Sequence, residues 1–72
     1  MARYCVNRNA QPGTNDHEVH NLDNNCIRLP SAANQIYLGA FASCVGAVAS
    51  AKGRVGNDVN GCYYCASECN SG

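Results

Sequence analysis

Three of the six cysteines in this 72-residue chain lie close together near its C-terminus. Cys62, Cys65 and Cys69 follow one another at the spacing C-x2-C-x3-C, in the run NGCYYCASECN. Two cysteines separated by two residues form a knuckle, from which both thiolates reach one tetrahedral metal ion. Clustered cysteines also form disulfides or serve as reactive nucleophiles. The function predicted from the sequence therefore depends on which of these three chemistries applies.

The C-x2-C knuckle needs two further ligands to complete a tetrahedral metal site. His17 and His20 lie in the run HEVH. In a strand, residues three apart point to opposite faces, so at most one of the two histidines joins the site. His20 pairs with Cys26 at the spacing H-x5-C, and a Cys3His composition is suited to a structural zinc ion. The predicted ligands are His20, Cys26, Cys62 and Cys65.

Three cysteines are left outside this ligand set. Cys69 lies one helical turn after the knuckle, which makes it an alternative to His20 as the fourth ligand. Cys44 falls at a predicted helix N-terminus, where the helix dipole favours a reactive thiolate, although a small buried apolar residue is the commoner role there. Cys5 is expected to be a half-buried strand residue. Free thiols and a Cys5–Cys69 or Cys44–Cys69 disulfide all remain open.

The composition indicates that a metal ion or a disulfide must support the fold. Hydrophobic residues make up 46% of the chain, but many of them are Ala or Cys, and Leu, Ile, Val and Phe together number only twelve. A core of this size yields on the order of 3–5 kcal/mol in a chain this short. The net charge is zero and 14% of residues are charged. This balance argues against non-specific binding to nucleic acid or to an anionic membrane surface.

The N-terminal segment and the most apolar segment of the chain predict the cellular compartment of the protein. The start MARYCVNRNAQPG contains no apolar run of the kind found in secretory signals. The most apolar stretch, IYLGAFASCVGAVASA, is too short to cross a bilayer and ends at Lys52. A cytoplasmic location is therefore expected, where clustered cysteines are more often metal ligands than disulfides. A disulfide-stapled extracellular peptide is the alternative.

A β-hairpin and a third strand are predicted in the first half of the chain. Residues 3–7 and 16–22 alternate between apolar and polar residues and flank the turn signal Pro12-Gly13. Residues 23–34 are rich in Asn and are expected to form the loop that carries Cys26. Residues 35–38, QIYL, are a possible third strand.

One main helix is predicted over residues 44–53. Ser43 is a good N-cap and Gly53 a plausible stop. Val45, Val48 and Val55, preceded by Phe41, recur at roughly helical spacing and are expected to form the apolar stripe. Gly46 inside the helix costs up to about 1 kcal/mol relative to Ala, so the helix needs tertiary support. A loop and then a short helical turn in YYCASECN complete a single α+β domain, residues 1–72.

Several residues and motifs of the chain also match the pattern of a known family of small modules. They are His20, Cys26, IYL..F.S (36–43) and GCYYC (61–65). They resemble the small zinc module of the Ada type, found in the DNA methylphosphotriester acceptor and as a tail on nucleases. The match covers roughly residues 19–66. More closely, the chain resembles a group of uncharacterised small bacterial proteins with the motifs YxVNxNAQ, HEVH, YLGxF and GCYYC.

The resemblance to the Ada-type module implies a hairpin, a helix and a Cys-rich site, with the four predicted ligands at ligand positions. The first ligand pair of the methyl acceptor consists of cysteines with a shorter gap, whereas this chain has His20 and a gap of five residues. A neutral imidazole makes the site less anionic than a set of four thiolates. A structural site is therefore expected rather than a methyl acceptor.

The function expected from the sequence is a small zinc-stabilised binding or interaction module without catalysis. A nucleic-acid-associated module of the Ada type is an alternative from another class. Tyr63 and Tyr64 offer a platform for base stacking, but aromatic residues inside a knuckle more often shield the metal and complete a small core. No membrane association is expected, and the partner is a macromolecule or a small molecule that the sequence does not identify.

Overall fold

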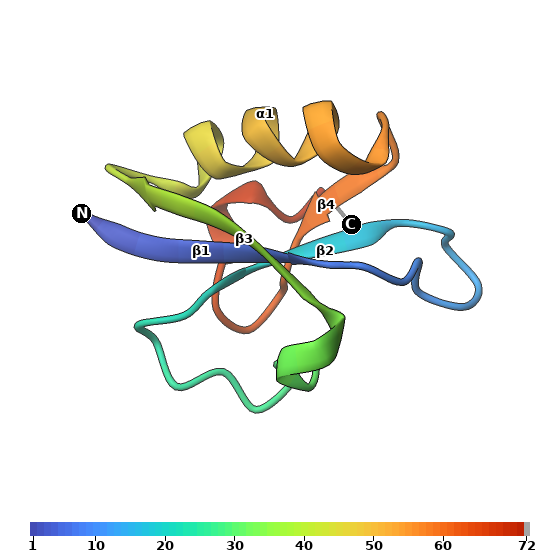
Figure 1. Ribbon diagram of the computed structural model, residues 1–72, viewed down its shortest axis with the longest axis horizontal. Coiled ribbons are helices and arrows are strands. Elements are labelled where there is room, and N and C mark those ends of the chain that lie inside the picture. The colour runs from blue at the N-terminus through green and yellow to red at the C-terminus, as the bar shows by residue number, and fades with distance from the viewer. Residues whose placement is uncertain (72) are drawn as a thin grey trace.

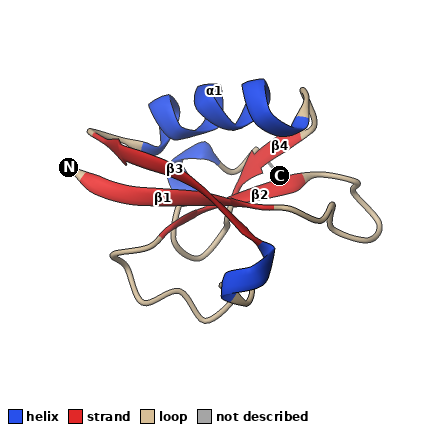
Figure 2. Cartoon of the chain, in the orientation of Figure 1, coloured by secondary structure: helices blue, strands red, loops and turns tan. Residues whose placement is uncertain are grey.

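The computed structural model describes residues 1–71, which form a four-stranded mixed sheet with one main helix on one of its faces (Figure 1). The predicted α+β fold class is confirmed. Two short 3-10 helices complete the chain (Figure 2). The elements are β1 (Ala2–Asn7), β2 (His17–Asn21), η1 (Ala32–Asn34), β3 (Gln35–Phe41), α1 (Cys44–Val55), β4 (Val59–Gly61) and η2 (Ser67–Cys69).

The sheet has the strand order β3-β1-β2-β4. The predicted hairpin is present, because β1 pairs with β2 in antiparallel orientation. The predicted third strand is also present as β3, which pairs with β1 and runs three residues further than expected, to Phe41. The prediction of a loop between the helix and the knuckle is wrong in part. Val59–Gly61 forms β4, which pairs in parallel with β2.

Alternation along β1 and β2 divides the sheet into two faces with different chemistry. Val6 lies directly opposite Val19 in the register, and Cys5 lies opposite His20. Directly opposed residues of neighbouring strands point to the same face, and successive residues point to opposite faces. The two valines belong to the apolar cluster that includes residues of α1. Cys5 and His20 therefore lie on the face turned away from the helix.

The helix packs against its face of the sheet through small residues. Ser43 caps its N-terminus as predicted, by accepting a hydrogen bond from the backbone N–H of Val45. The helix extends to Val55, two residues beyond the expected stop. Its buried residues are Cys44, Ala47 and Ala51. The predicted valine stripe is wrong at Val45, which is 69% exposed.

Gly46 leaves room for an aromatic ring at the end of β3. A Cβ atom placed on Gly46 would lie 2.8 Å from Cδ1 of Phe41, at the end of β3. The missing side chain thus gives the Phe41 ring its position against the first turn of α1. This contact is the tertiary support that the sequence predicted for a glycine inside the helix. No helix within residues 1–71 is long and apolar enough to cross a membrane.

Two glycines of α1 provide a matched test of this packing. We expect Gly53→Ala to raise the free energy of unfolding by up to about 1 kcal/mol, because nothing lies within 4 Å of its Cβ position and Ala favours the helix. Gly46→Ala receives the same helix propensity but collides with Phe41. It should lower the free energy of unfolding by about 1–2 kcal/mol.

Urea denaturation of both variants measures the difference. Equal stabilisation by the two substitutions would contradict the proposed role of the Gly46–Phe41 contact.

Candidate metal centre

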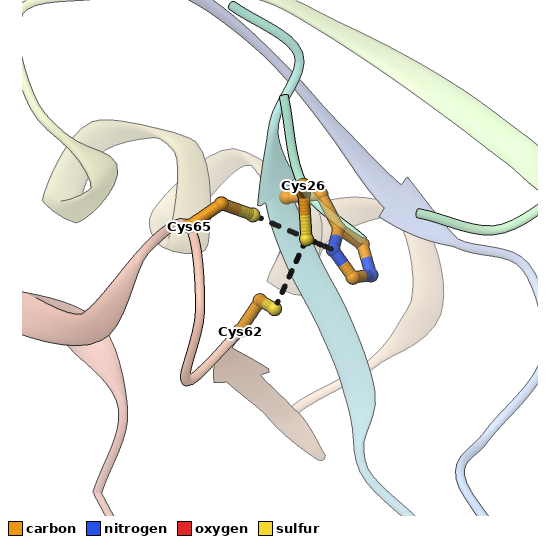
Figure 3. Close-up of side chains that lie close together, drawn as sticks. Cys26, Cys62 and Cys65 are labelled. Carbon is orange, nitrogen blue, oxygen red and sulfur yellow. Dashed lines mark hydrogen bonds between the residues drawn. The ribbon is translucent and has the colours of Figure 1, made fainter. Parts of the chain in front are cut away.

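Four side chains with metal-ligating atoms converge on the face of the sheet opposite α1. Each offers one ligand atom, and these atoms all lie within 4.8 Å of one another. Figure 3 shows the three cysteine sulfurs directed toward one another and toward a histidine ring. The four residues are His20, Cys26, Cys62 and Cys65. The structure thus brings together all four predicted ligands.

His20 presents Nδ1 to two of the sulfurs. This atom lies 3.7 Å from Cys26 Sγ and 3.6 Å from Cys65 Sγ. On the other side of the ring, Nε2 lies 3.8 Å from a carboxylate oxygen of Glu18, two residues earlier on the same face of β2. A carboxylate on the far side of a ligating imidazole orients the ring and favours the tautomer that is protonated there.

Burial keeps the imidazole of His20 neutral. The residue is only 1% exposed, and this desolvation lowers its pKa from the usual 6.5. A neutral ring with its proton on Nε2 leaves a lone pair on Nδ1, which is the form that coordinates a metal.

The knuckle is held by backbone hydrogen bonds to β2. The N–H of Cys62 donates to the carbonyl oxygen of Val19 at 2.9 Å, which extends the pairing of β4 with β2 by one residue. The N–H of Ala66 donates to the carbonyl oxygen of Cys62, also at 2.9 Å, and closes the turn. The N–H of Asn21 donates to Cys65 Sγ at 3.3 Å. These bonds fix both knuckle cysteines relative to His20.

Backbone N–H groups surround the remaining sulfurs as well. The N–H of Arg28 donates to Cys26 Sγ at 3.4 Å, and the backbone of Tyr64 and Cys65 hydrogen-bonds to the Cys62 sulfur. Such bonds stabilise thiolates, but burial opposes them and raises the pKa of both Cys62 and Cys65. Three thiolates at this separation need a cation among them, because their charges repel at short range.

Gly61 makes room for the segment that follows the knuckle. A Cβ atom at this position would lie 2.6 Å from the carbonyl oxygen of Ala66 and 2.7 Å from Cβ of Cys69. Glycine is therefore needed at this position because η2 returns closely onto β4.

A disulfide decides the predictions that were made for Cys44 and Cys69. Cys44 and Cys69 are bonded to each other, at a sequence separation of 25. The prediction that Cys69 is an alternative to His20 in the metal site is therefore wrong, because its sulfur faces α1 and is already bonded. Cys44 is buried as expected but is neither a free apolar residue nor a reactive thiol. Of the pairings left open, the structure contains Cys44–Cys69.

Cys5 is a free thiol that is completely buried. The sequence predicted a half-buried residue. Burial raises the pKa of its thiol to about 11, so it stays protonated and unreactive near neutral pH.

The aromatic residues of the knuckle do not shield the metal site. Tyr63 is 67% exposed and Tyr64 is 54% exposed, so the expectation that they complete the core is wrong. Their rings meet edge to face with centroids 5.3 Å apart, and the guanidinium of Arg28 lies 5.5 Å from the Tyr64 centroid. The knuckle and the loop that carries Cys26 are therefore joined at the surface as well as at the ligand cluster.

His17 lies outside the cluster, as the strand alternation predicted. Its Nδ1 is 2.9 Å from the carbonyl oxygen of Asn7, at the end of β1.

Comparisons with protein-family models, with curated proteins and with solved structures found no match for this chain. The resemblance to the Ada-type module stays a prediction.

Loss of the disulfide should destabilise the domain while leaving the ligand cluster in place. The bond closes a loop of 25 residues, which corresponds to about 3.5 kcal/mol of unfolded-chain entropy. We expect a variant with both Cys44→Ala and Cys69→Ala to lose about 2–4 kcal/mol of unfolding free energy in urea denaturation.

The same variant should bind one metal ion per chain, because neither sulfur belongs to the ligand cluster. Loss of metal binding from folded protein would contradict this separation of the two groups of cysteines.

Proposed function

We propose that the protein binds one structural zinc ion through His20, Cys26, Cys62 and Cys65 and acts as a small zinc-stabilised binding module without catalytic activity. The observation that carries the proposal is the separation of the ligand atoms. Cys26 Sγ and Cys62 Sγ lie 3.6 Å apart, and His20 Nδ1 lies 3.6 and 3.7 Å from two sulfurs.

These separations are close to those of a zinc tetrahedron. With zinc–sulfur bonds of about 2.3 Å and zinc–nitrogen bonds of about 2.0 Å, tetrahedral geometry places two sulfurs about 3.8 Å apart. It places a sulfur and a nitrogen about 3.5 Å apart. These three pairs would need shifts of only a few tenths of an ångström around a zinc ion, and the other pairs, which lie within 4.8 Å, would need to close by up to about 1 Å. Soft thiolate donors with one imidazole favour zinc over hard cations such as magnesium and calcium.

A closed set of four protein ligands supports a structural role. Catalytic zinc sites keep one coordination position for water or substrate, whereas structural sites fill all four positions with side chains. Three of the four ligand residues are buried, and Cys26 is partly exposed. The backbone N–H bonds to the sulfurs further fix the ligands in place.

The small core supports the need for a metal ion. Among residues 1–71, the largest fully buried side chains are His20, Val6, Val19, Cys5, Cys44 and Cys62. Two of these are proposed ligands, so a large part of the buried volume belongs to the metal centre itself. Structural zinc contributes on the order of 10–16 kcal/mol in small modules, more than this core supplies.

The exposed side chains beside the metal centre support a binding role. Ile27, next to Cys26, is 82% exposed, and the two tyrosines of the knuckle are also exposed. Tyr and Arg are the residue types that contribute most at protein interfaces. The metal would hold both loops in one arrangement and so lower the entropy cost of binding a partner.

The cytoplasmic location stays part of the proposal. The Cys44–Cys69 disulfide is more typical of an oxidising compartment. Alkylation of thiols in intact cells, followed by mass measurement of the protein, reports whether these two cysteines are bonded there.

The purified protein should contain one zinc ion per chain. Native mass spectrometry of protein prepared without chelator measures the bound ion directly. We expect Cys62→Ser to lose the zinc ion and the cooperative unfolding transition together, because the lost metal contribution exceeds the core's own stability. Folded wild-type protein with far less than one zinc per chain would refute the proposal.

The two histidines provide a matched pair for the fourth ligand. His20→Ala should weaken zinc binding strongly, and His17→Ala should leave the zinc affinity unchanged. For wild type, the zinc affinity should fall as the pH drops below the ordinary imidazole pKa of about 6.5, because burial lowers the pKa of His20 in the metal-free chain and a proton then competes with zinc for the ring.

This histidine component of the pH dependence should be absent in His20→Ala and present in His17→Ala. Competition titrations with a zinc-binding dye between pH 5.5 and pH 7.5 distinguish the two. Wild-type affinity in His20→Ala would mean that the imidazole does not coordinate the ion.

A further inference from the structure

The four ligand residues differ in their access to solvent. Cys62 is 1% exposed, Cys65 is 6% exposed and His20 is 1% exposed. Cys26 is partly exposed and lies in a loop whose neighbouring residues on both sides, 23–25 and 27–29, are all exposed. Of the four ligand residues, Cys26 is therefore the most accessible to a reagent from solvent.

Cys26 also has a second thiol within reach. Its Sγ lies 3.6 Å from Cys62 Sγ, while a disulfide bond is about 2.05 Å long. The two sulfurs need to approach by about 1.6 Å to form a bond, and the exposed loop of Cys26 provides the freedom to do so. Cys65 Sγ accepts the N–H of Asn21 at 3.3 Å and lies 3.6 Å from Nδ1 of His20. The completely buried Cys5 is outside the ligand cluster.

We propose that Cys26 is an oxidation site at which a hydroperoxide converts the metal centre into a Cys26–Cys62 disulfide and releases the metal ion. This inference rests on the zinc site proposed above and adds a regulated chemical reaction to it. In the reduced protein the metal ion then connects the Cys26 loop to the knuckle. In the oxidised protein the Cys26–Cys62 disulfide connects them.

The reaction takes place in two balanced steps when hydrogen peroxide is the oxidant. The thiolate of Cys26 attacks one peroxide oxygen, the O–O bond breaks, and the departing hydroxide takes up a proton to leave as water. The thiolate of Cys62 then attacks the sulfur of the Cys26 sulfenic acid, the S–O bond breaks, and a second water leaves after protonation. Two thiolates have lost two electrons to one peroxide. The metal ion leaves because two of its four ligands are gone.

The test uses the zinc-loaded full chain with an intact Cys44–Cys69 disulfide. Its zinc content is measured first by native mass spectrometry, so absence of zinc at this stage refutes the proposed function and, with it, this inference. Hydrogen peroxide is then added in the presence of a zinc-binding dye. We expect release of one zinc ion per chain.

Tryptic mapping after alkylation identifies the bond that forms. Before oxidation, the peptides 29–52 and 55–72 are joined through Cys44 and Cys69. After oxidation, we expect the peptide 9–28, which carries Cys26, to join them through Cys62, while Cys65 is alkylated. The peptide 4–8, which carries Cys5, should stay separate.

Two variants test the role of Cys26. Cys26→His keeps four metal-binding side chains but removes the exposed thiolate, so it should release zinc at least about tenfold more slowly than wild type. Cys5→Ser removes a thiol on the same sheet face outside the cluster, and its release rate should match wild type. Zinc release with the peptide 9–28 unlinked, or linked through Cys5 or Cys65, overturns the proposal. So does a Cys26→His variant that is loaded with zinc and releases it as fast as wild type.

Discussion

The structure depends on the close approach of three sulfurs and one imidazole nitrogen that come from distant parts of the chain. His20 and Cys65 are separated by 45 residues, yet their ligand atoms lie 3.6 Å apart. Three thiolates at such distances repel one another, and burial raises the pKa of two of them. Without a cation, burial favours the neutral thiol form of Cys62 and Cys65, and neutral thiols hold the loops only weakly. With a bound cation, the same four side chains would link distant segments of the chain more strongly than any other contact in the domain.

The strand β2 connects this cluster to the rest of the fold. Its alternation places Val19 in the apolar cluster under α1 and His20 in the ligand cluster on the other face. Both faces of the sheet are therefore stabilised through neighbouring residues of one strand. The disulfide lies on the helix side of the sheet. It joins the first residue of α1 to the last residue of η2, which is four residues after the end of the knuckle.

The parts of the structure that depend on local signals could be predicted from the sequence. Ser43 caps the helix through a hydrogen bond two residues away, and the C-x2-C spacing by itself brings two sulfurs to one point. The ligand set followed because strand alternation allows only one of the two histidines to join the site and the spacing to Cys26 favours His20. The strand β4 was missed because Asn and Gly have low strand propensity, and this segment is extended only through its pairing with β2.

Two further misses have a common cause, which is that burial depends on what lies opposite a residue. The valine stripe of α1 satisfied the helical period, but the helix lies so close to the sheet that small residues such as Ala47 form its contact face. The tyrosines of the knuckle are exposed although Cys62 and Cys65 on either side of them are buried. Likewise, the pairing of Cys44 with Cys69 could not be predicted without knowing that η2 returns to the start of α1.

The parallel pairing of β2 with β4 also determines the order in which the chain folds. A parallel pair cannot close as a hairpin, and here β3 and α1 must be crossed before β4 reaches its place beside β2. Contacts between segments so far apart are slow to form, because the loop-closure entropy is lost before the contact stabilises the chain. Residues 59–69 bring the edge strand, two cysteines of the ligand cluster and one half of the disulfide into the fold together. Without them the hairpin and the helix are joined by neither the ligand cluster nor the disulfide, so the rest of the domain depends on this late-pairing segment.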